Sequence, residues 1–259
     1  MEEKSLGFIG AGRIARILLE GLKRAGELPS KIVASDANED ILKKLKRDFP
    51  QIDTVSNENQ EAASQDIVFL AVHPPVIGGI LADIRSALRT SGILVSLAPK
   101  LSIGKISEYL GGFSGIVRMI PNAPSIVNEG YNPVAFHPAL TGTDKESLLA
   151  LFRVFGDCPE VNEEKLESYA IITAMGPTYL WFQLYELQKL GRRFGLTDEE
   201  LHDGIAKMIA GAVKTFFDTG LSAEAVMDLI PVKPLAGEEE NILNAYRSNL
   251  TALYQKMKS

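Results

Sequence analysis

The sequence predicts an α/β chain in which a doubly wound, mostly parallel sheet is followed by an all-helical domain. Three observations lead to this fold class. A glycine-rich turn joins the first predicted strand to the first helix, and strands then alternate with helices over residues 1–161. No strand pattern remains over residues 162–259. We therefore expect two domains that divide after residue 161.

The glycine-rich turn lies near the amino terminus, where an apolar strand is followed by Gly-Ala-Gly-Arg-Ile-Ala and an apolar helix. In a dinucleotide-binding (Rossmann) unit, Gly10 permits the tight turn, Gly12 lets the pyrophosphate approach the backbone, and Ala15 lets helix and strand pack closely. Arg13 and Ile14 open the helix, whose N–H groups and positive dipole end favour phosphate. An ordinary glycine turn has the same letters, but the strand before it and the helix after it favour dinucleotide binding.

An acidic residue follows the second predicted strand, residues 31–35. Asp36 stands at about the 20-residue offset expected of the acid that binds the adenosine ribose. Its carboxylate would repel a 2′-phosphate, and Ala37 and Asn38 offer no arginine to offset that repulsion. The cofactor is thus NAD or NADP, and we expect NADH to bind at least as well as NADPH.

The other elements of the first domain follow from the spacing of apolar residues. We predict helices over 38–49, 76–88, 103–110 and 145–155, and strands over 66–72, 92–97, 115–118 and 133–136. The run that ends at Val72 is continuously apolar, as is typical of a parallel strand covered on both faces.

The second domain shows only helical patterns. We predict helices over 164–194, with Gly176-Pro177 inside, over 197–217, over 223–229 and over 238–257. Thr197 with Glu200 forms a capping box at the start of the second of these.

Ligands of such sheets bind beyond the carboxyl ends of the strands. Val72, His73 and Pro74 end one strand, and we expect them to border the nicotinamide ribose; a solvated turn histidine is the alternative. Pro121 and Asn122 follow another strand, and we place them near the nicotinamide, although prolines and asparagine are also plain turn residues.

Composition excludes several classes of partner. The chain has a net charge of −6 without basic clusters, which argues against nucleic acid. No apolar run approaches the ~20 residues of a membrane span, and the start of the chain leaves no room for a signal peptide. The single cysteine, Cys158, suits a reducing compartment, so we expect a cytoplasmic protein. The three histidines lie far apart, so no metal site is expected.

The motifs GFIGAG–IA, LAVHP, VRMIPNAP and Gly-Pro-x-Tyr occur here in an order that resembles the pyrroline-5-carboxylate reductase family over nearly the whole chain. That resemblance implies a Rossmann domain and a helical dimerisation domain. It also implies reduction of a small cyclic imine to proline with NAD(P)H, at an active site between the cofactor and a helical bundle shared by two subunits.

Departures from the family pattern fall at the implied site. His73 stands where the family usually has lysine. The family's Ser-Pro-Gly-Gly-Thr-Thr loop, which holds the substrate, corresponds to residues 233–238, with Glu238 in place of a threonine. The resemblance makes Lys233 and Glu238 candidate catalytic residues: Glu238 would face the imine nitrogen and repel a substrate carboxylate, and Lys233 could pair with either acid. The alternative for Glu238 is complementation of the helix dipole.

Two functions of different classes stay open. The first is an NAD(P)H-dependent imine reductase; the second, favoured by the altered loop, is a non-catalytic dinucleotide-binding sensor or partner-binding module. A hydroxyacid-type dehydrogenase has less support, because no Gly-x-x-x-Lys-x-x-x-Asn helix follows the first domain.

Aromatic residues of the second domain predict assembly. The helices carry more apolar surface than one Rossmann face can cover, so we expect a homodimer, or a larger assembly of dimers, with interleaved helices around a two-fold axis. These aromatic residues are Trp181, Phe182, Tyr185, Phe216 and Phe217.

Overall fold

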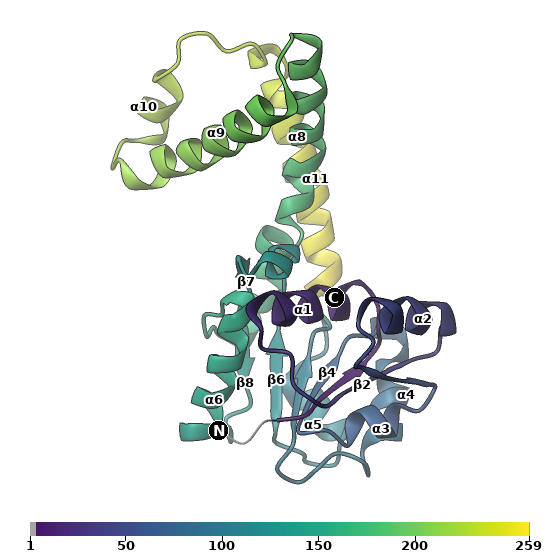
Figure 1. Cartoon of the computed structure of the whole chain (residues 1–259). Helices are drawn as coiled ribbons and strands as arrows, with labels where there is room; N and C mark the ends of the chain where they lie inside the picture. The colour runs from purple at the N-terminus through teal and green to yellow at the C-terminus, as the bar shows by residue number, and fades with distance from the viewer. Residues whose placement is uncertain (1–3, 259) are drawn as a thin grey trace. The chain divides into compact units, whose positions relative to one another are not determined.

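The computed structural model describes residues 4–258 and divides into two compact units (Figure 1). The first unit comprises residues up to 175 together with those from 254 onward, and the second comprises residues 176–253. The boundary expected from the sequence, after residue 161, marks the change to helical structure. The compact units divide later because residues 163–175 pack on the first unit through buried Leu166, Ala170 and Ile171.

A seven-stranded sheet forms the centre of the first unit, and its strands are parallel except for the last pair. In sheet order the strands are β3 (Asp53–Ser56), β2 (Ile32–Asp36), β1 (Leu6–Ile9), β4 (Ile67–Leu70), β5 (Ile93–Ser96), β6 (Ile116–Met119) and β8 (Val134–Phe136). A two-stranded sheet pairs β7 (Gly130–Tyr131) with β9 (Gly156–Asp157).

Helices cover both faces of the sheet, as the continuously apolar strands require. In the first unit they are α1 (Arg13–Ala25), α2 (Glu39–Asp48), α3 (Asn59–Ala63), α4 (Pro74–Ile84), α5 (Ile103–Tyr109), α6 (Gly142–Phe152) and α7 (Leu166–Tyr169). Shorter turns are η1 (Ala123–Val127), η2 (Arg153–Phe155), η3 (Glu163–Lys165) and the π-helical η4 (Ala170–Ala174).

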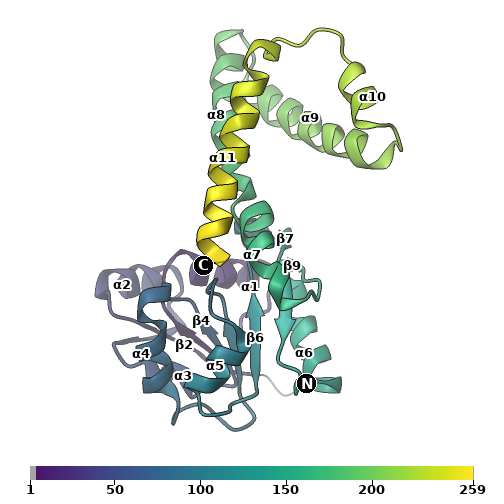
Figure 2. The same cartoon turned by 180° about the vertical axis from the view of Figure 1, so that it is seen from behind.

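The main core lies on the face covered by α1 and α6. Phe8 and Phe69 stack there with their ring centroids 5.0 Å apart, and Phe152 and Phe155 are fully buried in the same cluster. The opposite face packs against α4 and α5, which lie in front of the strands in Figure 2. Together these layers confirm the predicted doubly wound fold class.

Some elements of the first unit were not predicted. β7 and β9 have two residues each, too few to show a strand pattern. β3 is an edge strand whose four residues are exposed or half-buried, so it lacks the apolar run that identifies its neighbours. α3 is a five-residue helix, too short to show helical periodicity. The strand predicted at 66–72 is therefore the fourth of the chain, not the third.

The second unit consists of helices. They are α8 (Gly176–Arg193), α9 (Asp198–Asp218), α10 (Ala223–Asp228), the turn η5 (Ala236–Glu238) and most of α11 (Glu239–Lys258). The predicted capping box is confirmed: Glu200 N donates to Thr197 Oγ1 at 3.3 Å, and Thr197 N donates to Glu200 Oε2 at 2.8 Å. Helices α8 and α11 meet where Tyr179 and Tyr246 pack edge to face, 5.8 Å apart.

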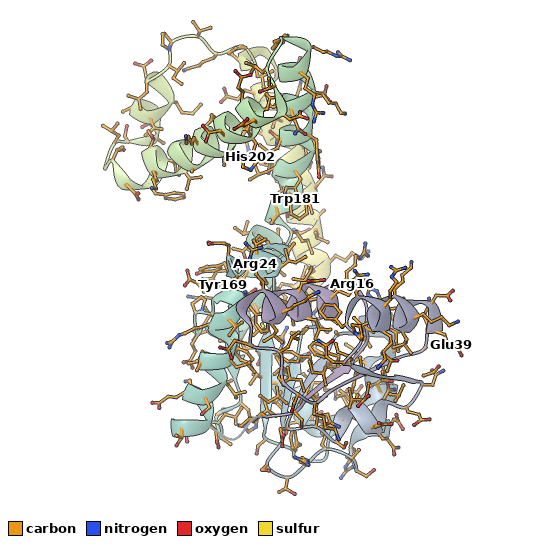
Figure 3. All side chains as sticks on the ribbon, viewed as in Figure 1. Arg16, Arg24, Glu39, Tyr169, Trp181 and His202 are labelled. Carbon is orange, nitrogen blue, oxygen red and sulfur yellow. The ribbon has the colours of Figure 1, made fainter. Side chains whose placement is uncertain are left out.

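Side chains of the second unit are mostly exposed. Trp181 on α8, labelled in Figure 3, is 45% exposed, and Phe217 on α9 is 73% exposed. Across residues 176–253 only Gly191 and Leu201 are buried. In the described part of the chain, no helix is long and apolar enough to cross a membrane.

Candidate functional site

The turn between β1 and α1 has room for glycine alone at position 10. Gly10 has a φ of +95°, and an added Cβ would lie 2.5 Å from the carbonyl oxygen of Ala71 and 3.0 Å from Val72 Cγ1. Its amide donates to Ser35 O at 2.8 Å. The turn is therefore held between the ends of β2 and β4, at the carboxyl edge of the sheet.

Gly12 differs from Gly10, because an added Cβ at Gly12 would meet no atom within 4 Å. It precedes α1, whose first turn has no acidic residue and no side-chain cap in the described structure. Arg13 is exposed and Ile14 half-buried at that helix start. Open space beside Gly12, next to the positive end of a helix dipole, fits the pyrophosphate of a dinucleotide.

Asp36 joins two turns at the same edge. Its Oδ2 accepts the Ala11 amide and its Oδ1 accepts the Asn38 amide, both at 2.8 Å. Asn38 in turn caps α2 by accepting the Asp40 amide at 2.9 Å. The carboxylate is partly buried and stands at the end of β2. This is the place at which a Rossmann unit binds the adenosine ribose.

The residues predicted after β4 lie beside the glycine turn. Val72 is half-buried against Gly10, and His73 is exposed as the residue that precedes α4. Pro74 is the first residue of that helix, and its side chain lies outside the part that the structure describes. Both readings of His73, a ribose contact or a solvated turn residue, stay open.

Asn122, after β6, is almost fully buried and held by hydrogen bonds. Its amide donates to Asn132 Oδ1 at 3.0 Å, and its Oδ1 accepts the Tyr131 amide at 3.1 Å. Its Nδ2 donates to the carbonyl of Thr173 at 3.5 Å. Pro121 beside it is half-buried. The structure thus places the Pro121-Asn122 segment at the carboxyl edge in a rigid conformation.

Two tyrosines near Asn122 were not singled out from the sequence. The rings of Tyr131 and Tyr169 lie 6.0 Å apart, and Tyr169 is labelled in Figure 3. Burial raises the pKa of Tyr131, and the neighbouring Tyr169 and Asp157 raise it further, so its phenol stays protonated at neutral pH. No spacing rule relates these residues, because they come from a two-residue strand and a four-residue helix.

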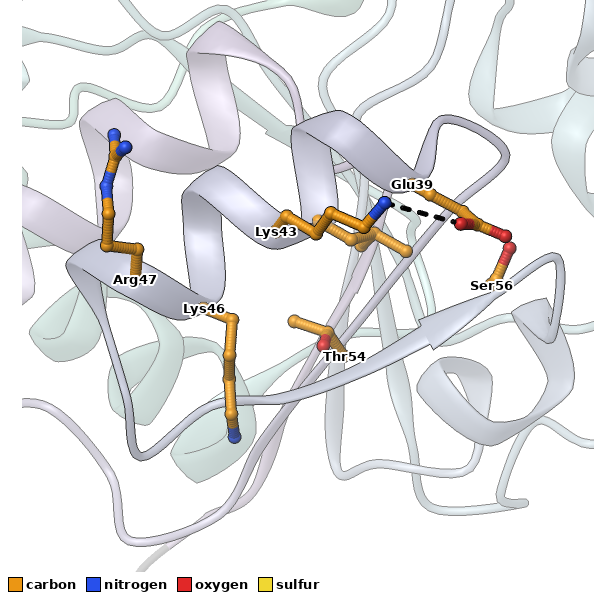
Figure 4. A pocket seen from close by; sticks show the side chains of 7 residues that line it. Glu39, Lys43, Lys46, Arg47, Thr54 and Ser56 are labelled. Atoms are coloured by element: carbon orange, nitrogen blue, oxygen red, sulfur yellow. Dashed lines mark ion pairs between the residues drawn. The ribbon is translucent and has the colours of Figure 1, made fainter.

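A shallow groove of about 480 Å³ lies between α2 and β3 (Figure 4). Its lining consists of Glu39, Leu42, Lys43, Lys46, Arg47, Thr54 and Ser56. Its cations already have partners: Lys43 lies 3.7 Å from the Glu39 carboxylate, and Lys46 donates to Ile52 O at 2.7 Å. The groove flanks the end of β2, since Ser56 pairs in register with Asp36.

The residues predicted to hold the substrate belong to the second unit. Glu238 is exposed at the end of η5, and its Oε2 accepts a hydrogen bond from Asn241 Nδ2 at 2.9 Å. Lys233 is also exposed, and the described residues include no ion pair between the two. Glu239 and Glu240 follow in the first turn of α11.

Comparison with known families supports the nucleotide-binding reading. Residues 5–100 match the family described as "NADP oxidoreductase coenzyme F420-dependent". This segment contains both glycines of the turn, Asp36 and the end of β4.

Similarity to individual proteins extends over most of the chain. It is 27% identical to the pyrroline-5-carboxylate reductase of Escherichia coli K12, over 88% of this chain and 85% of that protein. It is 29% identical to pyrroline-5-carboxylate reductase 2 of Bos taurus, over 83% of this chain and 68% of that protein. The crystal structure of the Plasmodium falciparum pyrroline carboxylate reductase with NADP bound matches with a TM-score of 0.82 and 25% identity, covering 100% of this chain and 98% of that one.

Proposed function

We propose that this chain, which resembles the pyrroline-5-carboxylate reductases in sequence and fold as expected, is an NAD(P)H-dependent oxidoreductase that reduces the C=N bond of a small cyclic imine. The β1–α1 turn carries this proposal: Gly10 is confined between strand ends, and Gly12 faces open space at a helix start. Those two properties suit a bound pyrophosphate.

Each part of the cofactor has its own set of residues at the carboxyl edge of the sheet. Gly12, Arg13 and Ile14 bind the pyrophosphate through backbone amides, and Asp36 binds the adenosine ribose. Val72, His73, Pro74, Pro121 and Asn122 border the nicotinamide end. When bound, the reduced cofactor supplies a hydride to the imine carbon, and the nitrogen of a protonated imine keeps its proton. The protein's part is position and electrostatics.

Lys233 and Glu238 are the proposed substrate contacts. The carboxylate of Glu238 stabilises a cationic imine or the amine product and disfavours an imine that bears its own carboxylate. We therefore propose that pyrroline-5-carboxylate is a poor substrate and that a related imine without the acid is preferred.

Two further properties belong to the proposal. The chain forms a homodimer, and it binds NADH at least as well as NADPH. The exposed aromatic residues of α8 and α9 support an interface between copies of the chain. The carboxylate of Asp36 supports the cofactor preference. A cytoplasmic location suits a chain with one cysteine and a reduced nicotinamide cofactor.

The test is a steady-state screen of cyclic imines, with and without a carboxylate, against NADH and NADPH. Turnover with any imine is the expected result and rules out the non-catalytic alternative, which the changed loop at 233–238 favours. Cofactor binding without turnover across the screen would instead support a dinucleotide-binding sensor.

A further inference from the structure

A buried cation lies on β6, close to the segment that holds Asn122. The side chain of Arg118 is only 3% exposed. Its Nη1 lies 2.9 Å from Glu163 Oε1, and its Nη2 lies 2.7 Å from Glu167 Oε1. The two carboxylates come from η3 and α7, so one guanidinium joins the interior strand β6 to the helical segment that follows the sheet.

The same carboxylate oxygens hold the loop after β5, residues 97–102. Glu167 Oε1 accepts the Lys100 amide at 3.2 Å, and Glu163 Oε1 accepts the Ile103 amide at 2.7 Å. Lys100 has a φ of +77°, a left-handed conformation that a residue with a side chain rarely adopts. External contacts must therefore fix this loop. The two glutamates provide the contacts to its backbone amides, and the Lys100 side chain also donates to the Lys256 carbonyl.

Charge at Glu167 follows from these contacts. Burial opposes ionisation of Glu167, but the hydrogen bond and charge of Arg118, with the Lys100 amide, hold the pKa of its carboxyl below the usual value. The carboxylate is therefore ionised at neutral pH and accepts both donors at once.

Stability alone explains this network poorly. Arg118 Nε is buried and has no hydrogen-bond partner within residues 4–258, and neither has the Oγ of Ser96, its register neighbour on β5. A buried ion pair with incomplete hydrogen bonding is often no more stabilising than apolar residues of the same volume. What the network does achieve is the placement of two segments at the carboxyl edge of the sheet.

Both segments border the proposed nicotinamide end. The loop 97–102 leaves β5 between the ends of β4 and β6, where His73 and Asn122 stand. The helical segment continues from Glu167 to Thr173, whose carbonyl accepts a hydrogen bond from Asn122. Arg118 thus connects, through its two glutamates, to the backbone on either side of that end.

We propose that Arg118 is a positioning residue for the reductase reaction: through Glu163 and Glu167 it fixes the loop 97–102 and the segment 163–173 beside the reacting end of the cofactor. The expected effect on kcat rests on the proposed function. The expected ordering of the two segments rests on the ion-pair geometry alone.

The test compares two variants in the full-length protein. Arg118→Lys keeps the charge but replaces the two guanidinium nitrogens, which bind Glu163 and Glu167 separately, with one ammonium on a shorter side chain. The triple variant R118M/E163Q/E167Q removes all charges and keeps amide oxygens that can accept the Lys100 and Ile103 amides. Measured per folded protein, well below the thermal midpoint of each variant, we expect Arg118→Lys to lower kcat at least tenfold. The triple variant should recover most of the lost kcat.

Amide hydrogen exchange in the peptide that covers residues 97–103 gives a readout independent of activity. Arg118→Lys should raise exchange there at least tenfold and leave β1 unchanged, and the triple variant should restore protection. Unchanged exchange in Arg118→Lys would overturn the proposal, as would loss of kcat only in proportion to loss of folded protein. Absence of turnover in the unmodified protein, with the exchange result intact, would reject the proposed function and the kinetic part of this proposal, and would support the structural part.

Discussion

The two units of this chain differ in how much of their apolar side-chain surface is buried within the unit. In β1, β4, β5 and β6 every residue is buried, and helices cover both faces of the sheet. Over residues 176–253, by contrast, large apolar side chains such as Phe194, at 79% exposed, and Phe217, at 73%, face solvent.

This difference in burial separates the part of the proposed function that one copy of the chain can supply from the part that needs a second copy. The cofactor residues stand on the sheet unit, where strand ends and backbone hydrogen bonds fix them. The helical unit has the exposed apolar faces that a monomer rarely presents, and it carries Lys233 and Glu238. We therefore expect cofactor binding to be robust to changes in the helices, and substrate binding to depend on assembly.

The largest expected effect is a loss of stability caused by a substitution in the sheet unit. An added Cβ at Gly7, on β1, would lie 1.9 Å from the carbonyl oxygen of Ala62, so Gly7→Ala must displace backbone. We expect a loss of about 3 kcal/mol or more in the free energy of unfolding, measured by denaturant titration.

Gly12→Ala is the matched control, since its Cβ would meet nothing within 4 Å. It should unfold like the unmodified protein yet bind the reduced cofactor at least about tenfold more weakly, because a methyl group then occupies the approach of the pyrophosphate. Equal stability of the two variants would contradict the packing argument, and unchanged cofactor affinity in Gly12→Ala would contradict the assigned role of that turn.

The next prediction concerns the helical unit. Sedimentation at micromolar concentration should give a dimer or larger species, not the 28.2 kDa monomer. The double variant F182E/F217E should raise the dimer dissociation constant by roughly 30-fold or more, because charged side chains would replace aromatic contacts. Lys214→Glu, an exposed residue of the same helix as Phe217, controls for added negative charge. A monomeric unmodified protein would refute the assembly.

The same contrast explains what sequence reasoning found. Strands buried on both faces, such as β4, show continuous apolar runs, and glycine turns show fixed spacing, so the sheet and the β1–α1 turn were predictable. The edge strand β3 shows neither signal. Arg118 lies in the motif VRMIPNAP, but its partners Glu163 and Glu167 are 45 and 49 residues away in the chain. Contacts over such separations leave no periodic pattern in a single sequence.

A smaller effect is expected at the loop that departs from the reductase family. Glu238→Thr removes the carboxylate proposed to repel an acidic substrate, so KM for pyrroline-5-carboxylate should fall on the order of tenfold while kcat changes little. Glu239→Thr, its neighbour in the first turn of α11, is the matched control. If Glu238 serves the helix dipole alone, both variants will give the same kinetics. High activity in the unmodified protein that Glu238→Thr leaves unchanged or reduces would reject the substrate proposal.

The smallest expected effect is on cofactor preference and concerns Asp36, in the sheet unit. Charge repulsion across a partly solvated site is worth about 1 kcal/mol, so NADH should bind at least as tightly as NADPH and by up to about fivefold more tightly. Asp36→Asn removes the charge and keeps an oxygen that can accept the Ala11 amide, whereas Asp36→Ser also removes this hydrogen bond between the two turns. Dissociation constants for both cofactors should therefore show NADPH gaining relative to NADH in each variant, with a loss of stability only in Asp36→Ser. Tighter NADPH binding by the unmodified protein would refute the assignment of Asp36 to the ribose. A gain for NADPH in Asp36→Ser alone would show that the carboxylate's shape, and not its charge, sets the preference.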